Sequence, residues 1–101
     1  MKDTGQDENW VFVIVSNAGS DEEYLGLWDK EKDINFIPAF KSRDDANDCF
    51  ITIPREKGRK YEIQAIFFDE LLEDASKNGF DVAIVDSEGH ILEMIKRGNK
   101  V

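Results

Sequence analysis

The sequence contains a single cysteine, Cys49, so no disulfide bond can form within the chain. Proteins without disulfides are typical of reducing compartments, and the sequence therefore predicts a cytoplasmic location. Histidine is equally scarce, since His90 is the only one. One cysteine and one histidine are too few for the four-ligand sites that hold structural zinc, and we expect no cofactor.

Long apolar runs are also missing. The apolar stretch 11–15 has the length of a β-strand and falls far short of the roughly 20 residues that a membrane-spanning helix needs. The amino-terminal segment MKDTGQDEN lacks the apolar core of a secretory signal. We therefore expect neither membrane insertion nor secretion.

Positive charge is scarce. The chain has 13 lysines and arginines and 22 aspartates and glutamates, so its net charge is −9. This field repels phosphate groups, which excludes binding to nucleic acid through a broad basic face. The densest basic segment, 55–60, reads REKGRK and is predicted to be a solvated loop. An acidic protein can instead mimic nucleic acid, but the interspersed lysines and the scattered acids disfavour that role.

The sequence does have enough apolar material for one folded domain. Hydrophobic residues make up 41% of its 101 residues and charged residues 35%, a balance typical of a globular protein. We expect a single domain over residues 9–97, with loose segments at 1–8 and 98–101. The hydrophobic pattern predicts two helices, capped at Ser42 and Asp69, and strands at 10–16, 24–28, 34–40, 61–67, 81–86 and 90–95.

These elements follow the order βββαβαββ and predict an α+β fold. The strand at 10–16 is apolar on both faces, which indicates a central strand. Pro38 indicates an edge strand or a bulge, because proline has no N–H to donate to a ladder. We expect a mainly antiparallel mixed sheet of five to six strands, with both helices packed on one of its faces.

Local signals set the ends of the two helices. The hydroxyl of Ser42 can accept from the amide of Asp45, which begins the first helix, and Pro54 ends it. Gly79 can take the left-handed conformation that ends the second helix, with Phe80 folding back onto its last turn.

Residues 44–48 read DDAND, the spacing with which isoprenoid synthases hold magnesium and a diphosphate. On a helix Asp44 and Asp48 share a face, but magnesium requires further oxygen ligands to complete its shell. Acids in a first turn also stabilise a helix through its dipole. We therefore predict a helix start and no metal site, with Cys49 as a buried structural thiol on the apolar stripe.

Three potential metal ligands, Asp86, Glu88 and His90, stand at alternate positions of a predicted hairpin tip. A neutral imidazole with carboxylates suits zinc or nickel. The same residue types are ordinary turn chemistry, and no second histidine completes a tetrahedral site. A turn is the preferred interpretation, and metal binding at this hairpin is the alternative.

Carboxylates also crowd the second predicted helix. Paired carboxylates serve acid–base chemistry where one of them is buried. The helical spacing places this group on the polar side, so we predict a solvated face made of Asp69, Glu70, Glu73 and Asp74.

Aromatic residues between positions 24 and 40 supply a candidate interaction surface. Aromatic side chains near strand ends either pack in the core or form an exposed patch for a partner. A hairpin with a proline and a short charged turn suits an edge where a peptide or a second copy docks. We predict a protein partner or a homodimer at this surface, through Tyr24, Trp28, Phe36 and Pro38.

Two stretches, VFVIVSNAGS at 11–20 and FKSRDDANDCF at 40–50, carry a family resemblance. Together they resemble a small bacterial and plastid domain family of unknown function, whose members have a strand entering Asn-Ala-x-Thr/Ser and later Phe-x-Ser-x-x-Asp-Ala before a helix. The segment 68–80 is also similar to small domains with an effector-associated or stress annotation. The resemblance covers residues 10–95 and implies a compact α+β fold without known catalytic residues. The chain departs from the family at 55–60 and in the terminal hairpin.

These observations favour a non-enzymatic protein-interaction or regulatory module. A small metal-binding protein or enzyme that uses Asp86, Glu88 and His90 is the alternative. An acidic mimic of nucleic acid is the third hypothesis.

Overall fold

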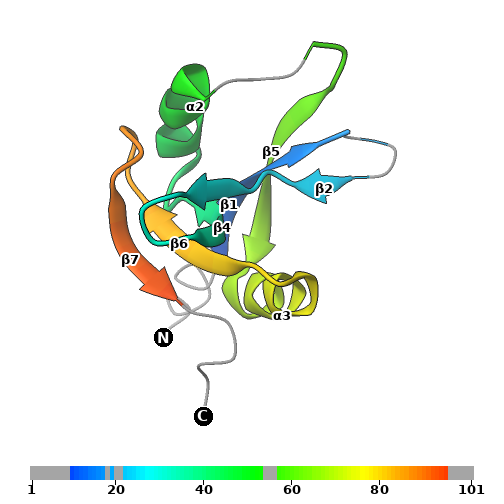
Figure 1. Ribbon diagram of the computed structural model, residues 1–101. Coiled ribbons are helices and arrows are strands. Elements are labelled where there is room, and N and C mark those ends of the chain that lie inside the picture. Colours follow the sequence, from blue (N-terminus) through cyan, green and yellow to red (C-terminus); the bar gives the residue numbers. More distant parts are fainter. Residues whose placement is uncertain (1–9, 18, 20–21, 54–56, 96–101) are drawn as a thin grey trace, which may run out of the picture.

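The computed structural model describes residues 10–17, 19, 22–53 and 57–95. The elements, shown in Figure 1, are β1 (Trp10–Ser16), β2 (Glu23–Tyr24), β3 (Leu27–Asp29), β4 (Ile34–Ala39), α2 (Arg43–Thr52), β5 (Tyr61–Phe67), α3 (Phe68–Asn78), β6 (Asp81–Val85) and β7 (Ile91–Ile95). This order confirms the α+β class, with one difference: the predicted strand at 24–28 is divided into β2 and β3. The predicted loose ends, 1–8 and 98–101, and the predicted helix stop at Pro54 lie outside the described residues.

The described strands form two sheets, one with the order β2-β1-β5 and the other with the order β3-β4-β6-β7. Each described pairing is antiparallel except that of β4 with β6, which is parallel, so the mainly antiparallel mixed character is confirmed. Phe12 of β1 and Phe40, just after β4, exchange two backbone hydrogen bonds of 2.8 Å. This bridge joins the two sheets.

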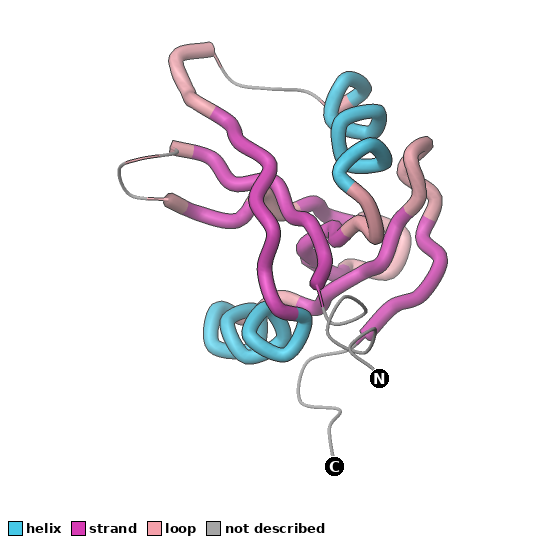
Figure 2. Tube along the Cα trace, turned by 180° about the vertical axis from the view of Figure 1, so that it is seen from behind, coloured by secondary structure: helices cyan, strands magenta, loops and turns pink. Residues whose placement is uncertain are grey.

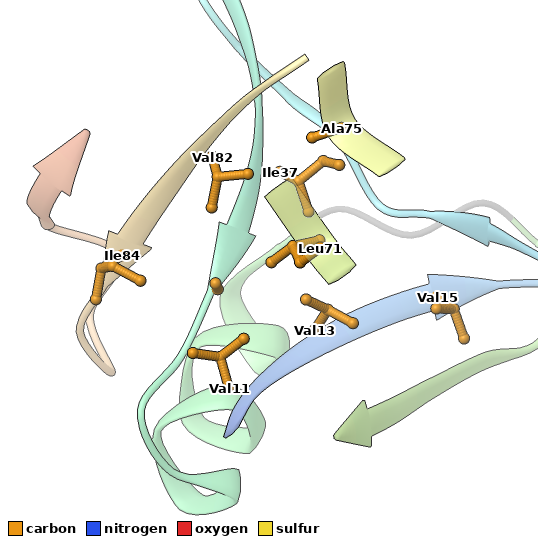
Figure 3. Packing of buried hydrophobic residues seen from close by; sticks show 9 residues of the cluster. Val11, Val13, Val15, Ile37, Leu71, Ala75, Val82 and Ile84 are labelled. Atoms are coloured by element: carbon orange, nitrogen blue, oxygen red, sulfur yellow. The ribbon is translucent and has the colours of Figure 1, made fainter. Parts of the chain in front are cut away.

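The side chains of β1 alternate between two hydrophobic clusters, one on each face of the sheets. Val11, Val13 and Val15 point into a cluster that α3 covers with Leu71 and Ala75, as Figure 3 shows. All of these side chains are almost fully buried, since none exposes more than 6% of its surface.

The second cluster lies on the opposite face of β1. Ile14 packs there with Phe40 and with Ala46 and Cys49 of α2. The two helices therefore cover opposite faces, an arrangement that Figures 1 and 2 show from two sides. The prediction that both helices pack on one face is wrong, because β1 and β6 carry apolar side chains on both faces and each face needs a cover.

Pro38 lies inside a central strand. β4 is placed between β3 and β6, so the prediction of an edge strand is wrong. Backbone N–H groups two residues apart point to the same side of a strand, so the nitrogen of Pro38 faces the side on which Phe40 meets β1. β3 pairs with β4 only as far as Phe36, and the missing N–H therefore falls in the gap between the two sheets.

The helix ends follow local chemistry in most respects. Ser42 caps α2 by accepting from the amide of Asp45 at 3.1 Å, as predicted. Gly79 ends α3 in the left-handed conformation, and the amide of Phe80 donates to the carbonyl of Ala75. The prediction that Asp69 caps α3 is wrong, since the helix starts directly after β5 without a side-chain cap.

Gly26 explains why the predicted strand at 24–28 divides. A Cβ atom at this position would lie 2.8 Å from Cε1 of Phe80, well inside van der Waals contact. Phe80 is placed there by the turn at Gly79 that ends α3. The chain must therefore pass the Phe80 ring without a side chain at the point where it leaves β2, which pairs with β1, and enters β3, which pairs with β4.

We predict that Gly26→Ala lowers the free energy of unfolding by about 1–3 kcal/mol, the usual effect of overpacking a well-filled site. Urea unfolding followed by circular dichroism measures the loss. The matched control is the same substitution in a Phe80→Leu background, where the smaller side chain relieves the contact and the loss should shrink. An equal loss in both backgrounds would contradict the role given to Phe80.

Candidate functional site

An open groove lies beside α3, on the face of the three-stranded sheet that this helix does not fully cover. α3 packs against β6 and β5, and the sheet surface beside it remains accessible. The groove has a volume of about 490 Å³. The residues that line it come from four elements and one loop: Trp10, Val13, Val15, Glu22, Glu23, Tyr24, Gln64, Ala65, Ile66, Phe67, Glu70 and Asp74.

The floor of the groove is the α3 side of the β1–β5 ladder. Val13 and Val15 of β1 pair with Gln64 and Glu62 of β5, so all four side chains stand on the α3 side of the sheet. Ile66 follows on the same face and packs against the α3 cluster. Val13 and Val15 are almost fully buried, so Ile66, which is half-buried, is the residue of this set that offers apolar surface to the groove.

The rim of the groove is acidic. Glu70 and Asp74 lie one turn apart on α3 and form one wall. Glu22 stands near the edge of the sheet, where its carboxylate accepts from the Gly19 amide at 2.9 Å and lies 3.5 Å from Nε2 of Gln64. Among the described residues that line the groove, none is basic, so it presents a negative potential to solvent.

Tyr24 ties the acidic wall to the sheet. Its hydroxyl donates to the Asp74 carboxylate at 2.6 Å, which connects β2 to α3 across 50 residues of sequence. Burial, together with this hydrogen bond, raises the pKa of Tyr24 well above its usual value. The phenol therefore stays protonated and keeps its donor role at every physiological pH.

We predict that Tyr24→Phe lowers the free energy of unfolding by about 1 kcal/mol, the usual net value of a lost hydrogen bond. Thermal or urea unfolding of the purified chain measures it. In an Asp74→Asn background, which weakens the acceptor, the same substitution should have a smaller effect. Additive losses in this double-mutant cycle would show that the two side chains are not coupled.

An exposed aromatic pair lies at the end of the β1–β5 ladder, where the register places it on the face of the sheet opposite to Ile66. The rings of Trp10 and Phe67 stack with centroids 4.1 Å apart and an interplanar angle of 29°. Trp10 remains 40% exposed and Phe67 45% exposed, so the pair offers a rigid apolar platform to solvent. Large exposed aromatic residues are common anchors in protein interfaces.

The predicted interaction surface is divided by the structure. Tyr24 lines the groove, and Trp28 is 59% exposed, with its Nε1 donating to Asp33 at 3.2 Å. Phe36 and Pro38 lie in the core instead, because β4 is a central strand. Only Tyr24 and Trp28 of the four are accessible to a partner.

The hairpin ligands do come together. Oδ1 of Asp86 accepts from the backbone amides of Glu88 and His90 at 2.9 and 2.8 Å, and its Oδ2 lies 3.3 Å from Nδ1 of His90. Glu88 lies 3.6 Å from the same imidazole nitrogen. Both oxygens of Asp86 thus have partners in the turn, and the described residues hold no group of three or more side chains suited to a metal ion.

The backbone amide of His90, with smaller contributions from the amide of Glu88 and from the imidazole, holds the pKa of Asp86 below its ordinary value of 3.8. A carboxyl group with a lowered pKa in the folded state stabilises that state above its unfolded pKa, and the contribution is lost as pH falls through the folded pKa. Asp86 therefore supports the hairpin at neutral pH.

We predict that Asp86→Asn lowers the free energy of unfolding at pH 7 and that its difference from the parent shrinks as pH falls from about 5 to about 2. Urea titrations across this range measure the difference. Asp48→Asn, which removes an exposed carboxylate from α2, corrects for the change in net charge. A difference that does not vary with pH would exclude the hydrogen-bonded role of Asp86.

The other acidic and thiol candidates have structural roles. Asp44 and Asp45 occupy the first turn of α2, where they complement the helix dipole, and Asp48 is exposed. Cys49 is a free, buried thiol, and burial raises its pKa, which makes it a poor nucleophile.

The groove was not predicted from the sequence. Its residues are drawn from positions 10 to 74, and their proximity depends on the pairing of β1 with β5 and on the direction of α3. One signal was available. Glu70 and Asp74 stand one turn apart on α3, and the pairing of β2 with β1 brings Tyr24 close to Asp74. The prediction treated these carboxylates as a solvated face only.

Neither described helix has the length and apolar character needed to cross a membrane. A family model described as "Domain of unknown function (DUF3110)" matches residues 11–95, which include nearly all of the described fold. No curated protein and no solved structure matches the chain. The match confirms the resemblance to a small family of unknown function that the two sequence stretches indicated.

Proposed function

We propose that this chain, which belongs to the DUF3110 family of domains of unknown function, is a non-enzymatic protein-interaction module. The partner docks in the groove beside α3. The observation that carries this proposal is the acidic groove with half-buried Ile66 in its lining, together with the exposed aromatic pair at the adjoining end of the β1–β5 ladder.

The composition of the groove is that of an interface. Protein interfaces combine an apolar centre with a polar rim, and a few aromatic anchors supply most of the binding energy. Ile66 supplies the apolar centre, Glu22 and Glu70 the rim, and Trp10, which is 40% exposed, an aromatic anchor beside the groove. Trp28, the exposed middle residue of β3, is a second contact point in this proposal.

Metal binding at the hairpin is the weaker candidate. The side chains of Glu88 and His90 are 74% and 71% exposed, and Asp86 already accepts two backbone hydrogen bonds. A cation at this place would compete with the turn for its carboxylate. An acidic mimic of nucleic acid is also disfavoured, because the acids of the groove come from a loop, a strand and a helix and form no ridge.

We place the protein in the cytoplasm, because its one cysteine is a free and buried thiol, which suits a reducing compartment. The partner is a protein, either a different chain or a second copy of this one. Nucleic acid is not expected as a ligand, given the net charge of −9.

Photo-crosslinking tests the docking site. The photoreactive residue p-benzoylphenylalanine replaces Phe67, which lines the groove, or, as the control, Ile51 of α2, which is 71% exposed and does not line it. In extracts of the cells that naturally contain the protein, we expect a discrete crosslinked product from position 67 only. A product of twice the chain's mass identifies a second copy as the partner.

Competition makes the test specific. Excess unlabelled protein should suppress the product from position 67, whereas the Trp10→Ala variant should suppress it less, because it lacks half of the aromatic pair. Equal products from positions 67 and 51, or no product from position 67, would overturn the groove as a docking site.

A further inference from the structure

The outermost strands of the two described sheets are β2, β5, β3 and β7, and three of these edges are protected against pairing with another chain. β2 has 2 residues and β3 has 3, which is too short to template a further strand. β7 pairs with β6 through a register shift at Ile84/Val85, and such an irregularity discourages a regular ladder on its outer side.

β5 is the exception. It has 7 residues, pairs with β1 in one continuous register along its whole length, and contains no proline. The two hydrogen bonds between Phe12 and Phe40 show that the even-numbered residues of β1 point their backbone groups away from β5. Val13 therefore exchanges hydrogen bonds with Gln64, and the odd-numbered residues of β5 direct their N–H and C=O groups outward.

These outward backbone groups have little cover. In the part of the chain that the structure describes, one hydrogen bond reaches those of Ile63 and Ala65, from Nη1 of Arg43 to the Ile63 carbonyl at 3.1 Å. The Arg43 guanidinium lies over the Phe12 ring, 5.2 Å from its centroid, so it approaches from the face that α2 covers. A carbonyl oxygen accepts two hydrogen bonds, so this contact leaves the edge open to another strand.

The sequence of β5 is complementary to itself. Because Gln64 is the middle residue, antiparallel pairing of two copies over the full strand places Gln64 opposite the same residue of the second copy. The outward groups of Ile63 then meet those of Ala65. Glu62, the one charged residue of β5, lies opposite Ile66, so no like charges face each other within the strand pair.

The exposed aromatic pair gains a neighbour in this arrangement. Tyr61 of one copy lies opposite Phe67 of the other, because these residues stand at the two ends of β5. Phe67 is 45% exposed and stacks on Trp10, so the row of aromatic rings continues across the boundary between the copies. Cross-strand aromatic pairs stabilise a sheet.

The charges that flank β5 favour the antiparallel direction. The strand is preceded by Lys57, Arg59 and Lys60. It is followed, in the first turn of α3, by Asp69 and Glu70. Antiparallel pairing brings the basic end of each copy to the acidic end of the other, whereas parallel pairing would align like charges. This arrangement gives a role to the basic segment, which the sequence predicted only as a solvated loop.

We infer that two copies of this chain associate through the outer edge of β5, in antiparallel register about Gln64, so that their three-stranded sheets become continuous. The inference concerns the edge of the strand and not the groove, and it does not depend on the proposed function. The net charge of −9 on each copy opposes association when salt is low, so the dimer is measured at physiological ionic strength.

Disulfide trapping tests the register in the purified full chain. Two variants are made in a Cys49→Ala background, where the introduced cysteine is the only thiol. Gln64→Cys places two cysteines opposite each other at a non-hydrogen-bonded pair, where Cα atoms lie about 4.5 Å apart and a disulfide fits. Glu62→Cys, the control on the same face of β5, leaves the two cysteines several residues apart. Under mild oxidation we expect at least about fivefold more covalent dimer from position 64 than from position 62.

Sedimentation velocity at rising protein concentration measures the association itself. We expect the parent chain to shift from monomer toward dimer. Ala65→Pro removes an outward N–H that the ladder with β1 does not use, so the chain should stay folded and self-association should weaken at least about tenfold. Ala65→Ser, the control, keeps this N–H and should associate within about twofold of the parent. Circular dichroism verifies that each variant is folded.

Charge substitutions separate local pairing from the general field. Asp69→Lys adds two units to the net charge of −9, so a purely long-range effect would strengthen the dimer. Local pairing of the two ends predicts the opposite, a weakening of about threefold by Asp69→Lys and by Lys60→Glu. The chain with both substitutions should regain the association of the parent.

A parent chain that stays monomeric at every concentration would overturn the inference, as would equal trapping from positions 64 and 62. Unchanged association of the Ala65→Pro variant would place the contact elsewhere. A stronger dimer with Asp69→Lys would contradict the antiparallel arrangement of charges. A monomeric chain whose p-benzoylphenylalanine at position 65 crosslinks to a different protein in cell extract would assign the edge to that protein.

This outcome is distinguishable from that of the groove. A product of twice the chain's mass from position 67 that is lost in the Ala65→Pro variant arises from β5 pairing and supports the dimer alone. A product from position 67 that persists in this variant supports docking in the groove, whatever the result of the sedimentation experiment.

Discussion

The structure depends on one constraint: β1 is apolar on both of its faces and has to be covered on both. Its valines point toward α3, and Ile14 points toward α2, so neither helix alone can complete the core. β6 is also buried on both faces and, like β1, is a central strand of its own sheet. The Phe12–Phe40 bridge then joins the two sheets under both helices. The two-layer cover, the split sheet and the groove all follow from this requirement.

The groove arises where the cover is incomplete. α3 begins directly at the end of β5, without a connecting loop, and its direction brings Asp74 to Tyr24. One helix of 11 residues cannot shield the full width of the strands below it, and the α3 side of β5 remains partly open. A fully apolar opening would favour aggregation, whereas the carboxylates around this one keep it hydrated.

The sequence was sufficient for the elements and insufficient for their placement. Short-range chemistry located the Ser42 cap and the Gly79 turn correctly, because both depend on residues within one helical turn. The central position of Pro38 was beyond such reasoning, since it depends on a gap between sheets that only the tertiary structure creates. The division at Gly26 likewise requires Phe80, which is 54 positions later in the chain. The groove is a long-range feature of the same kind, and no local pattern in Trp10 or Asp74 indicates that they line one surface.

The Trp10–Phe67 stack also gives the molecule an optical property. Indole emission responds to the polarity of its surroundings, and Trp10 stands at the groove, partly in solvent and partly against an aromatic ring. The second tryptophan, Trp28, lies away from this groove, against Asp33 in the turn between β3 and β4. The two indoles therefore report on different regions of the surface. Replacing Trp28 with phenylalanine would leave Trp10 as the single tryptophan, whose emission wavelength would report on this end of the β1–β5 ladder without any attached label.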